Sequence, residues 1–136
     1  MSWVEIVHTG MLGSGFITTA AVLSPEGVQF AGTVGFKVLK EDFDPMAKAF
    51  HDHSDLFRRG LTLNGKKYVA ISANPRIIHC KSGPSGVICM RALHCVLVGL
   101  YFPPVTAPQA VGTMESVADA INDGVYRTEK DADPQD

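Results

Sequence analysis

The chain has 136 residues, of which 46% are hydrophobic and 19% charged, with a formal net charge of −2. These values predict one globular domain with a real core, and they argue against general nucleic-acid binding, which needs concentrated positive charge. No apolar stretch approaches the ~20 residues of a membrane span, and no basic segment precedes an apolar run, so we expect neither a span nor a secretory signal. The three cysteines form no C-x-x-C pair, which suits a reducing, cytoplasmic environment.

The charge is concentrated at the C-terminus. The segment EKDADPQD (129–136) holds four carboxylates against one lysine, a net charge of −3, so the rest of the chain sums to +1. Such composition is typical of a solvated segment. We therefore expect a domain over 1–126 and an acidic, disordered tail over 127–136.

The first half of the chain starts with a helix. Ser2 and Glu5 form the Ser-x-x-Glu capping box, which predicts a helix over 3–11 that the following Gly-Ser-Gly ends. The β-branched segment 17–23, a Ser-Pro-Glu-Gly turn and the segment 28–32 predict a hairpin.

A second helical segment follows at 41–52. We expect Asp44 to cap it and Pro45 to take its first helical position. Residues 53–59 add a short helical turn, which Gly60 stops.

The second half is mostly strands and one helix. Asn64 and Gly65 favour a type I′ turn inside 61–71. Further strands are expected over 76–80, 86–91 and 94–101. Thr106 and Pro108 open the last helix, which carries an apolar stripe of Val111, Met114, Val117, Ala118 and Ile121 and ends at Gly124. The strand connections are too short for parallel crossovers. The fold class is therefore α+β, a central antiparallel sheet with the N- and C-terminal helices on one face and shorter helices on the other.

No metal site is expected. His51 and His53 diverge on a helix, and His79 and Cys80 face opposite sides of a strand. Zinc sites usually bring four ligands together at tighter spacing.

Catalytic motifs also fail. The stretch GLTLNGKK (60–67) begins like a phosphate-binding loop, but a lysine stands where serine or threonine is needed, and the context is a hairpin. His94 and Cys95 are adjacent in an apolar strand, so they point apart instead of forming a base–nucleophile pair. We expect no enzyme activity and no cofactor.

Four collinear stretches carry a family resemblance: MSW (1–3), LTLNGKKY (61–68), LVGLYFPPVTAPQ (97–109) and VADAINDGVY (117–126). Together they resemble profilin, the small actin-monomer-binding protein. The resemblance implies a cytoplasmic, cytoskeletal protein that binds monomeric actin, regulates its polymerisation and binds proline-rich partners such as formins. It also implies phosphoinositide binding, which the few clustered lysines disfavour.

The resemblance places a polyproline groove between the terminal helices, at Trp3, Ile6, Phe30, Ala120 and Tyr126. Ile6 replaces the family's usual groove tyrosine, Ala120 a histidine or tyrosine, and Phe30 a second tryptophan. Losing interface aromatics predicts proline binding weaker by roughly 10- to 100-fold, or its loss. From the residues alone, the terminal aromatics could equally fill a seam between two helices.

The actin-binding face implied by the resemblance comprises Phe57, Arg58, Lys67, His79, Lys81, Met90 and Arg91. An apolar anchor with basic groups suits an acidic partner, although these side chains could also form a plain solvated surface. Met90 stands where the family often has lysine.

The alternative hypothesis assigns a different function to the same fold. A small antiparallel α+β domain of this outline could serve as a trafficking or motor-complex subunit that does not bind actin. Such subunits dimerise through a sheet edge or a helix, so concentration-dependent mass would favour this interpretation.

Overall fold

The computed structural model describes residues 2–124; Tyr126 and the expected tail at 127–136 lie outside this range. Seven antiparallel strands form one curled sheet in the order β2-β1-β7-β6-β5-β4-β3. The strands are β1 Thr19–Leu23, β2 Gln29–Gly32, β3 Leu61–Leu63, β4 Lys66–Ala73, β5 Ile77–Ser82, β6 Ser85–Ala92 and β7 Cys95–Tyr101. The predicted α+β class is confirmed.

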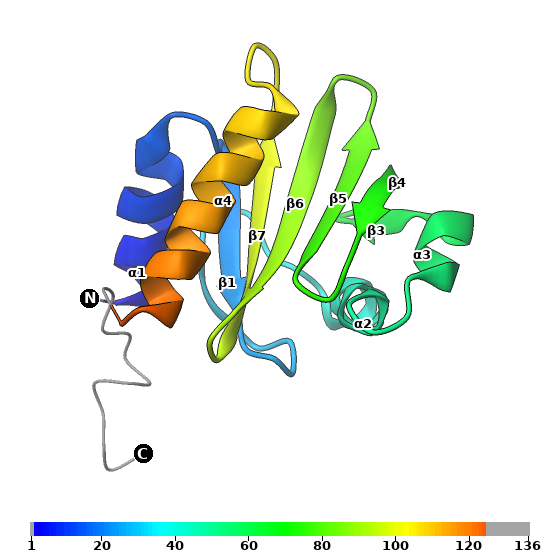
Figure 1. Cartoon of the computed structure of the whole chain (residues 1–136), viewed down its shortest axis with the longest axis horizontal. Helices are drawn as coiled ribbons and strands as arrows, with labels where there is room; N and C mark the ends of the chain where they lie inside the picture. The colour runs from blue at the N-terminus through cyan, green and yellow to red at the C-terminus, as the bar shows by residue number, and fades with distance from the viewer. Residues whose placement is uncertain (1, 125–136) are drawn as a thin grey trace.

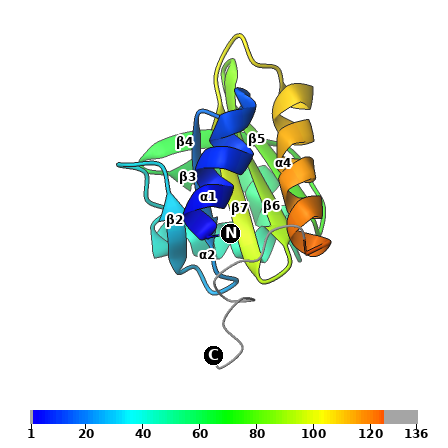
Figure 2. The same cartoon turned by 90° about the vertical axis from the view of Figure 1, so that its left-hand side faces the viewer.

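Helices lie on both faces of the sheet (Figure 1). The N-terminal helical segment consists of α1 Trp3–Glu5, the wider π-type turn η1 Ile6–Met11 and the 3₁₀ turn η2 Leu12–Ser14. It lies beside α4 Ala107–Asn122 on one face, and the turned view in Figure 2 shows the same pairing. The helix α2 Lys40–Ala49 packs on the other face of the sheet, and α3 Ser54–Arg59 lies beside the β3–β4 end.

Local signals set several boundaries as predicted. The amide of Glu5 donates to Ser2 Oγ at 3.2 Å, and the amide of Ser2 donates to Glu5 Oε1 at 3.0 Å, which completes the capping box. Asn64 and Gly65 both have positive φ, 51° and 78°, as a type I′ turn requires. Thr106 caps α4, with its own amide donating to Gln109 Oε1 at 2.9 Å.

The expected start of the second helix is wrong. The helix begins at Lys40 with Leu39 in the N-cap position, so Asp44 does not cap it and Pro45 lies inside it. The earlier start places Phe43 and Met46, 1% and 0% exposed, together in the core. Their burial outweighs the hydrogen bond that Pro45 cannot make.

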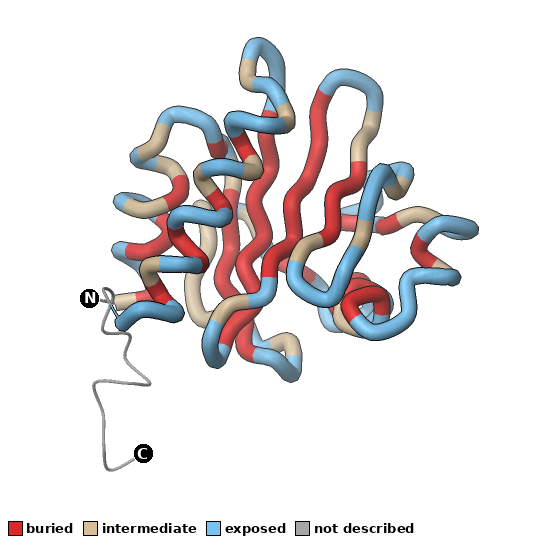
Figure 3. The backbone as a smooth tube through the Cα atoms, viewed as in Figure 1, coloured by how far each residue is buried: buried red, intermediate tan, exposed pale blue. Residues whose placement is uncertain are grey.

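Each face of the sheet carries one apolar core. Figure 3 shows that buried residues run along the central strands. The strands β6 and β7 are buried on both faces: Val87 and Cys89 pack toward α2, whereas Ile88 and Leu97 pack toward the terminal helices. The two edge strands, β2 and β3, are the shortest, with four and three residues.

Candidate functional site

Trp3 is a packing residue in this structure. As the first residue of α1 it is held by the capping box, and only 4% of it is exposed. Its ring stacks on Phe30 of β2, with ring centroids 4.7 Å apart and planes at 21°. The two rings therefore join the start of the N-terminal helix to the edge of the sheet.

The other predicted groove residues differ in their access to solvent. Ile6 is 0% exposed, so it supports the helix pair from below and offers no contact surface. Ala120 is half-buried on α4, as is Phe30 on β2. Tyr126 lies outside the described residues. The structure thus brings Trp3 and Phe30 together, with Ile6 buried beneath the helix pair.

A hollow of about 500 Å³ lies at the opposite end of the helix pair, which the sequence did not predict. Small side chains leave the space: Gly10 and Ser14 on the N-terminal segment, Gly112 and Ser116 on α4. Phe16, 37% exposed, also lines it.

The sheet has an open face over β4 and β5. The helix α4 packs over β6 and β7, and Figure 1 shows no helix in front of β4 and β5. On this face Val69 is 63% exposed and Ile71 52% exposed. A bulge between Ala70 and Ser72 interrupts the pairing of β4 with β5 and adds one residue opposite His79. Val69 and Ile71 thus place exposed apolar surface on a part of the sheet that no helix covers.

Two lysines flank these apolar side chains. Lys81 on β5 lies directly opposite Val69 in the register, so both project to the same side. Lys67 precedes Val69 by two positions on β4 and is exposed on that side as well. Together Lys67, Val69, Ile71 and Lys81 form the surface that we call the open face. The sequence prediction contained its two lysines and missed its two apolar residues.

His79 lies beneath this face. It is 9% exposed, and its Nε2 is 2.7 Å from the hydroxyl of Tyr101, a core residue of β7. Burial, and to a smaller extent the charge of Lys81, lowers the pKa of His79 below its ordinary value. The Tyr101 ring lies against Gly86, where a Cβ would meet it at 2.5 Å. His79 therefore supports the open face through a packed polar contact and presents little surface of its own.

Met90 and Arg91 lie apart from the open face for two different reasons. Met90 is 1% exposed and packs in the core beneath the terminal helices. Arg91 projects to the other side of the sheet, where its guanidinium lies 5.8 Å from the centroid of the Phe50 ring and donates to the Pro75 carbonyl at 3.2 Å. Met90 thus shares the sheet side of Lys81 but is covered there, whereas Arg91 faces the opposite side. Their place in the actin-binding face stays a prediction.

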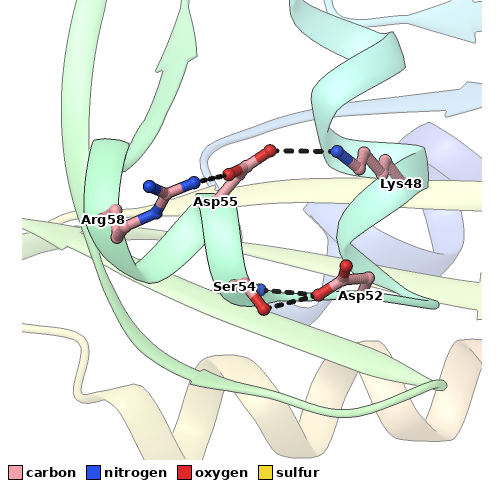
Figure 4. A network of polar contacts seen from close by, with 5 residues as sticks. All are labelled: Lys48, Asp52, Ser54, Asp55 and Arg58. Carbon is pink, nitrogen blue, oxygen red and sulfur yellow. Dashed lines mark hydrogen bonds and ion pairs between the residues drawn. The ribbon is translucent and has the colours of Figure 1, made fainter.

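Phe57 and Arg58 lie on α3, beyond the β3–β4 end of the sheet (Figure 1). Phe57 is 49% exposed. Arg58 forms an ion pair with Asp55, which also accepts from Lys48 Nζ at 2.9 Å (Figure 4). These two cations lower the pKa of Asp55 to about 2. The network joins α2 to α3, the helix that carries Phe57.

The described residues hold no group of three His, Cys, Asp or Glu side chains that could bind a metal ion. All three cysteines are buried, and burial raises the pKa of Cys80 to about 12. Within residues 2–124 no helix is long and apolar enough to cross a membrane.

Comparison with known proteins agrees with this geometry. Residues 1–126 match the profilin family. Profilin of Schizosaccharomyces pombe is 36% identical over 123 residues, 89% of this chain and 96% of the yeast protein. Profilin of Drosophila melanogaster is 34% identical over 121 residues, with the same coverage. The crystal structure of Acanthamoeba castellanii profilin II superposes with a TM-score of 0.86 at 30% identity, covering 91% of this chain and 99% of that one.

The chain therefore belongs to the profilin family. Profilins are actin-binding, cytoskeletal proteins that regulate actin polymerisation as binding proteins and not as enzymes. Its last ten residues, 127–136, lie beyond the family match.

Proposed function

We propose that this protein binds monomeric actin through the open face and thereby regulates actin polymerisation in the cytoplasm. The exposed pair Val69 and Ile71, flanked by Lys67 and Lys81, is the observation that carries the proposal. Apolar side chains supply the desolvated centre of an interface, and the lysines attract an acidic partner surface. His79 and Phe57 act from beneath the face and from its α3 border.

A charged residue in the centre of the open face tests this proposal. The substitution Val69→Glu places a carboxylate where an apolar anchor would be buried, so the affinity for monomeric actin should fall roughly 10-fold or more. The matched control is Val28→Glu, because Val28 is 62% exposed, almost the same as Val69, and lies in the β1–β2 connection. We expect Val28→Glu to bind within about 2-fold of the unsubstituted protein. Equal losses in both variants would contradict the proposal.

We further propose that the helix-pair end at Trp3 and Phe30 binds proline-rich segments, such as those of formins, with reduced affinity. Mouse profilin IIa has been solved with a double repeat from the FH1 domain of mDia1, and it shares this fold at 20% identity with a TM-score of 0.71. Here Trp3 is 4% exposed and Ile6 fully buried, so a polyproline ligand finds less aromatic surface on which to stack.

Trp3 reports on this proposal directly, because it is the one tryptophan in the chain. Intrinsic fluorescence is titrated with octaproline in this protein and in Schizosaccharomyces pombe profilin, with Trp3→Phe as the control for signal origin. We expect a saturable change with a Kd roughly 10- to 100-fold above that of the yeast protein. Equal affinities would contradict the weakened site, and a flat titration at millimolar peptide would remove proline binding from the proposal.

Phosphoinositide binding stays a prediction with little support. Lys67 and Lys81 are the cations of the open face, whereas polybasic lipid-binding surfaces cluster several more.

A further inference from the structure

The segment 127–136 lies beyond the family match and carries four carboxylates against Arg127 and Lys130. Its net charge of −2 equals that of the whole chain, so the profilin-like region is neutral in sum. Because the domain has no net charge, the acidic segment is attracted or repelled mainly by the individual charged side chains that it can reach.

The open face offers uncompensated positive charge. Among residues 2–124, neither Lys67 nor Lys81 has an ion-pair partner. Arg76, just before β5, is already paired with Asp119 of α4. The exposed side of α4 carries Glu115 and Asp119, and Asp123 is its C-cap; these carboxylates repel an acidic segment from the helix. Arg91 also lacks an ion-pair partner among residues 2–124, but it faces the other side of the sheet, over the Phe50 ring. On the side of the sheet that α4 covers, the pair of lysines across β4 and β5 is therefore the surface that attracts carboxylates.

The distances permit contact. Gly124 follows Asp119 by five residues, about 8 Å along a helix axis, and Asp119 reaches Arg76 at the start of β5. Lys81 lies five residues further along β5, about 17 Å. An extended chain from Gly124 reaches about 17 Å at Glu129, about 30 Å at Asp133 and about 40 Å at Asp136, so the last two carboxylates are the ones that can reach Lys81.

We propose that segment 127–136 docks on the open face of its own chain, with its carboxylates against Lys67 and Lys81. The segment then competes intramolecularly with an acidic partner for the same two cations. A tethered segment acts at millimolar effective concentration, so weak ionic contacts suffice for partial occupancy. Because those contacts are exposed, salt weakens them. The competition rests on the proposed actin function, whereas the docking does not.

Zero-length carbodiimide cross-linking of the full chain, without actin, tests the docking. The cross-linker joins a carboxylate to an amine that contacts it, and peptide mass spectrometry identifies the pairs. We expect cross-links from 129–136 to Lys67 and Lys81, and at least several-fold fewer to the exposed Lys37 of the β2–α2 connection. Mixed isotope labelling separates contacts within one chain from contacts between chains. Equal labelling of Lys37, or cross-links only between chains, would overturn the proposal.

Competition is tested with a full-length variant in which Glu129→Gln, Asp131→Asn, Asp133→Asn and Asp136→Asn remove the acidic charge. Its affinity for monomeric actin should exceed that of the unsubstituted chain by about 3- to 10-fold at low salt, and by less than 2-fold near 0.3 M salt. Unchanged affinity at low salt would refute competition. Failure of both proteins to bind actin would refute the proposed function, and the cross-links would still decide the docking.

Discussion

Gly86→Ala tests the packing beneath the open face. An added Cβ would lie 2.5–2.6 Å from two ring carbons and the hydroxyl oxygen of Tyr101. Ordinary contact needs about 3.5 Å, so the ring must retreat by about 1 Å. Tyr101 is 1% exposed and its hydroxyl is 2.7 Å from His79 Nε2. A retreat of that size stretches the contact to about 3.7 Å, beyond hydrogen-bond range.

Two effects then add to the destabilisation. Overpacking a core site lowers the free energy of unfolding by about 1–3 kcal/mol, and a buried polar group that loses its hydrogen-bond partner lowers it by a similar amount. Because the ring movement relieves part of the first effect while causing the second, we expect the free energy of unfolding to fall by about 2–4 kcal/mol.

Urea unfolding followed by circular dichroism measures this change. Gly112→Ala is the matched control, because its Cβ would meet nothing within 4 Å and it lies in the interior of α4. Alanine favours a helix over glycine by about 1 kcal/mol, so this control should be stabilised. In a Tyr101→Leu background the effect of Gly86→Ala should shrink below about 1 kcal/mol, because the leucine side chain is smaller. A loss under about 0.5 kcal/mol in the natural background, or an undiminished loss in the Tyr101→Leu background, would refute the reasoning.

Three further predictions concern titratable groups. Because the pKa of His79 is lowered, the native protein binds fewer protons than the unfolded chain below about pH 6.5. The free energy of unfolding should therefore fall as the pH drops from 6.5 toward the folded pKa. The substitution His79→Gln should make this pH dependence flatter, and an identical pH dependence in both proteins would contradict the prediction. The Asp55 carboxyl, with a pKa of about 2, should remain ionised at pH 3 in an NMR titration, and a midpoint near the ordinary 3.8 would count against its two ion pairs. The buried thiols, with the pKa of Cys80 near 12, should resist a thiol-specific colorimetric reagent at pH 8 until the protein is unfolded; rapid native labelling would show that the core opens.

Much of the fold could be read from local signals. The Ser2–Glu5 capping box and the Asn64–Gly65 turn each satisfy a backbone requirement within a few residues, so their sequence context suffices. The helix start predicted at Pro45 was wrong because a contact distant in the sequence decided it. Proline usually marks a helix start, but here the burial of Phe43, on the N-terminal side of Pro45, extends the helix backward.

The candidate site was harder to predict, because its character depends on what covers it. Tyr68, Val69, Ala70 and Ile71 are all apolar or small, a pattern that indicates a strand buried on both faces. Only the placement of α4 over β6 and β7 leaves Val69 and Ile71 in solvent. Nothing within the strand itself carries that information.

The shortness of β2 and β3 has a consequence for solubility. An exposed apolar strand surface invites other chains to add to a sheet, and the free backbone groups at sheet edges are where such addition begins. In this molecule the outermost strands β2 and β3 offer an incoming chain only four and three residues to pair with. The strand β3 pairs with Lys66–Tyr68 of β4, and α3 contacts β4 as well. The protein can thus expose an apolar surface to a folded partner while offering few unpaired edge residues to which a misfolded chain could add.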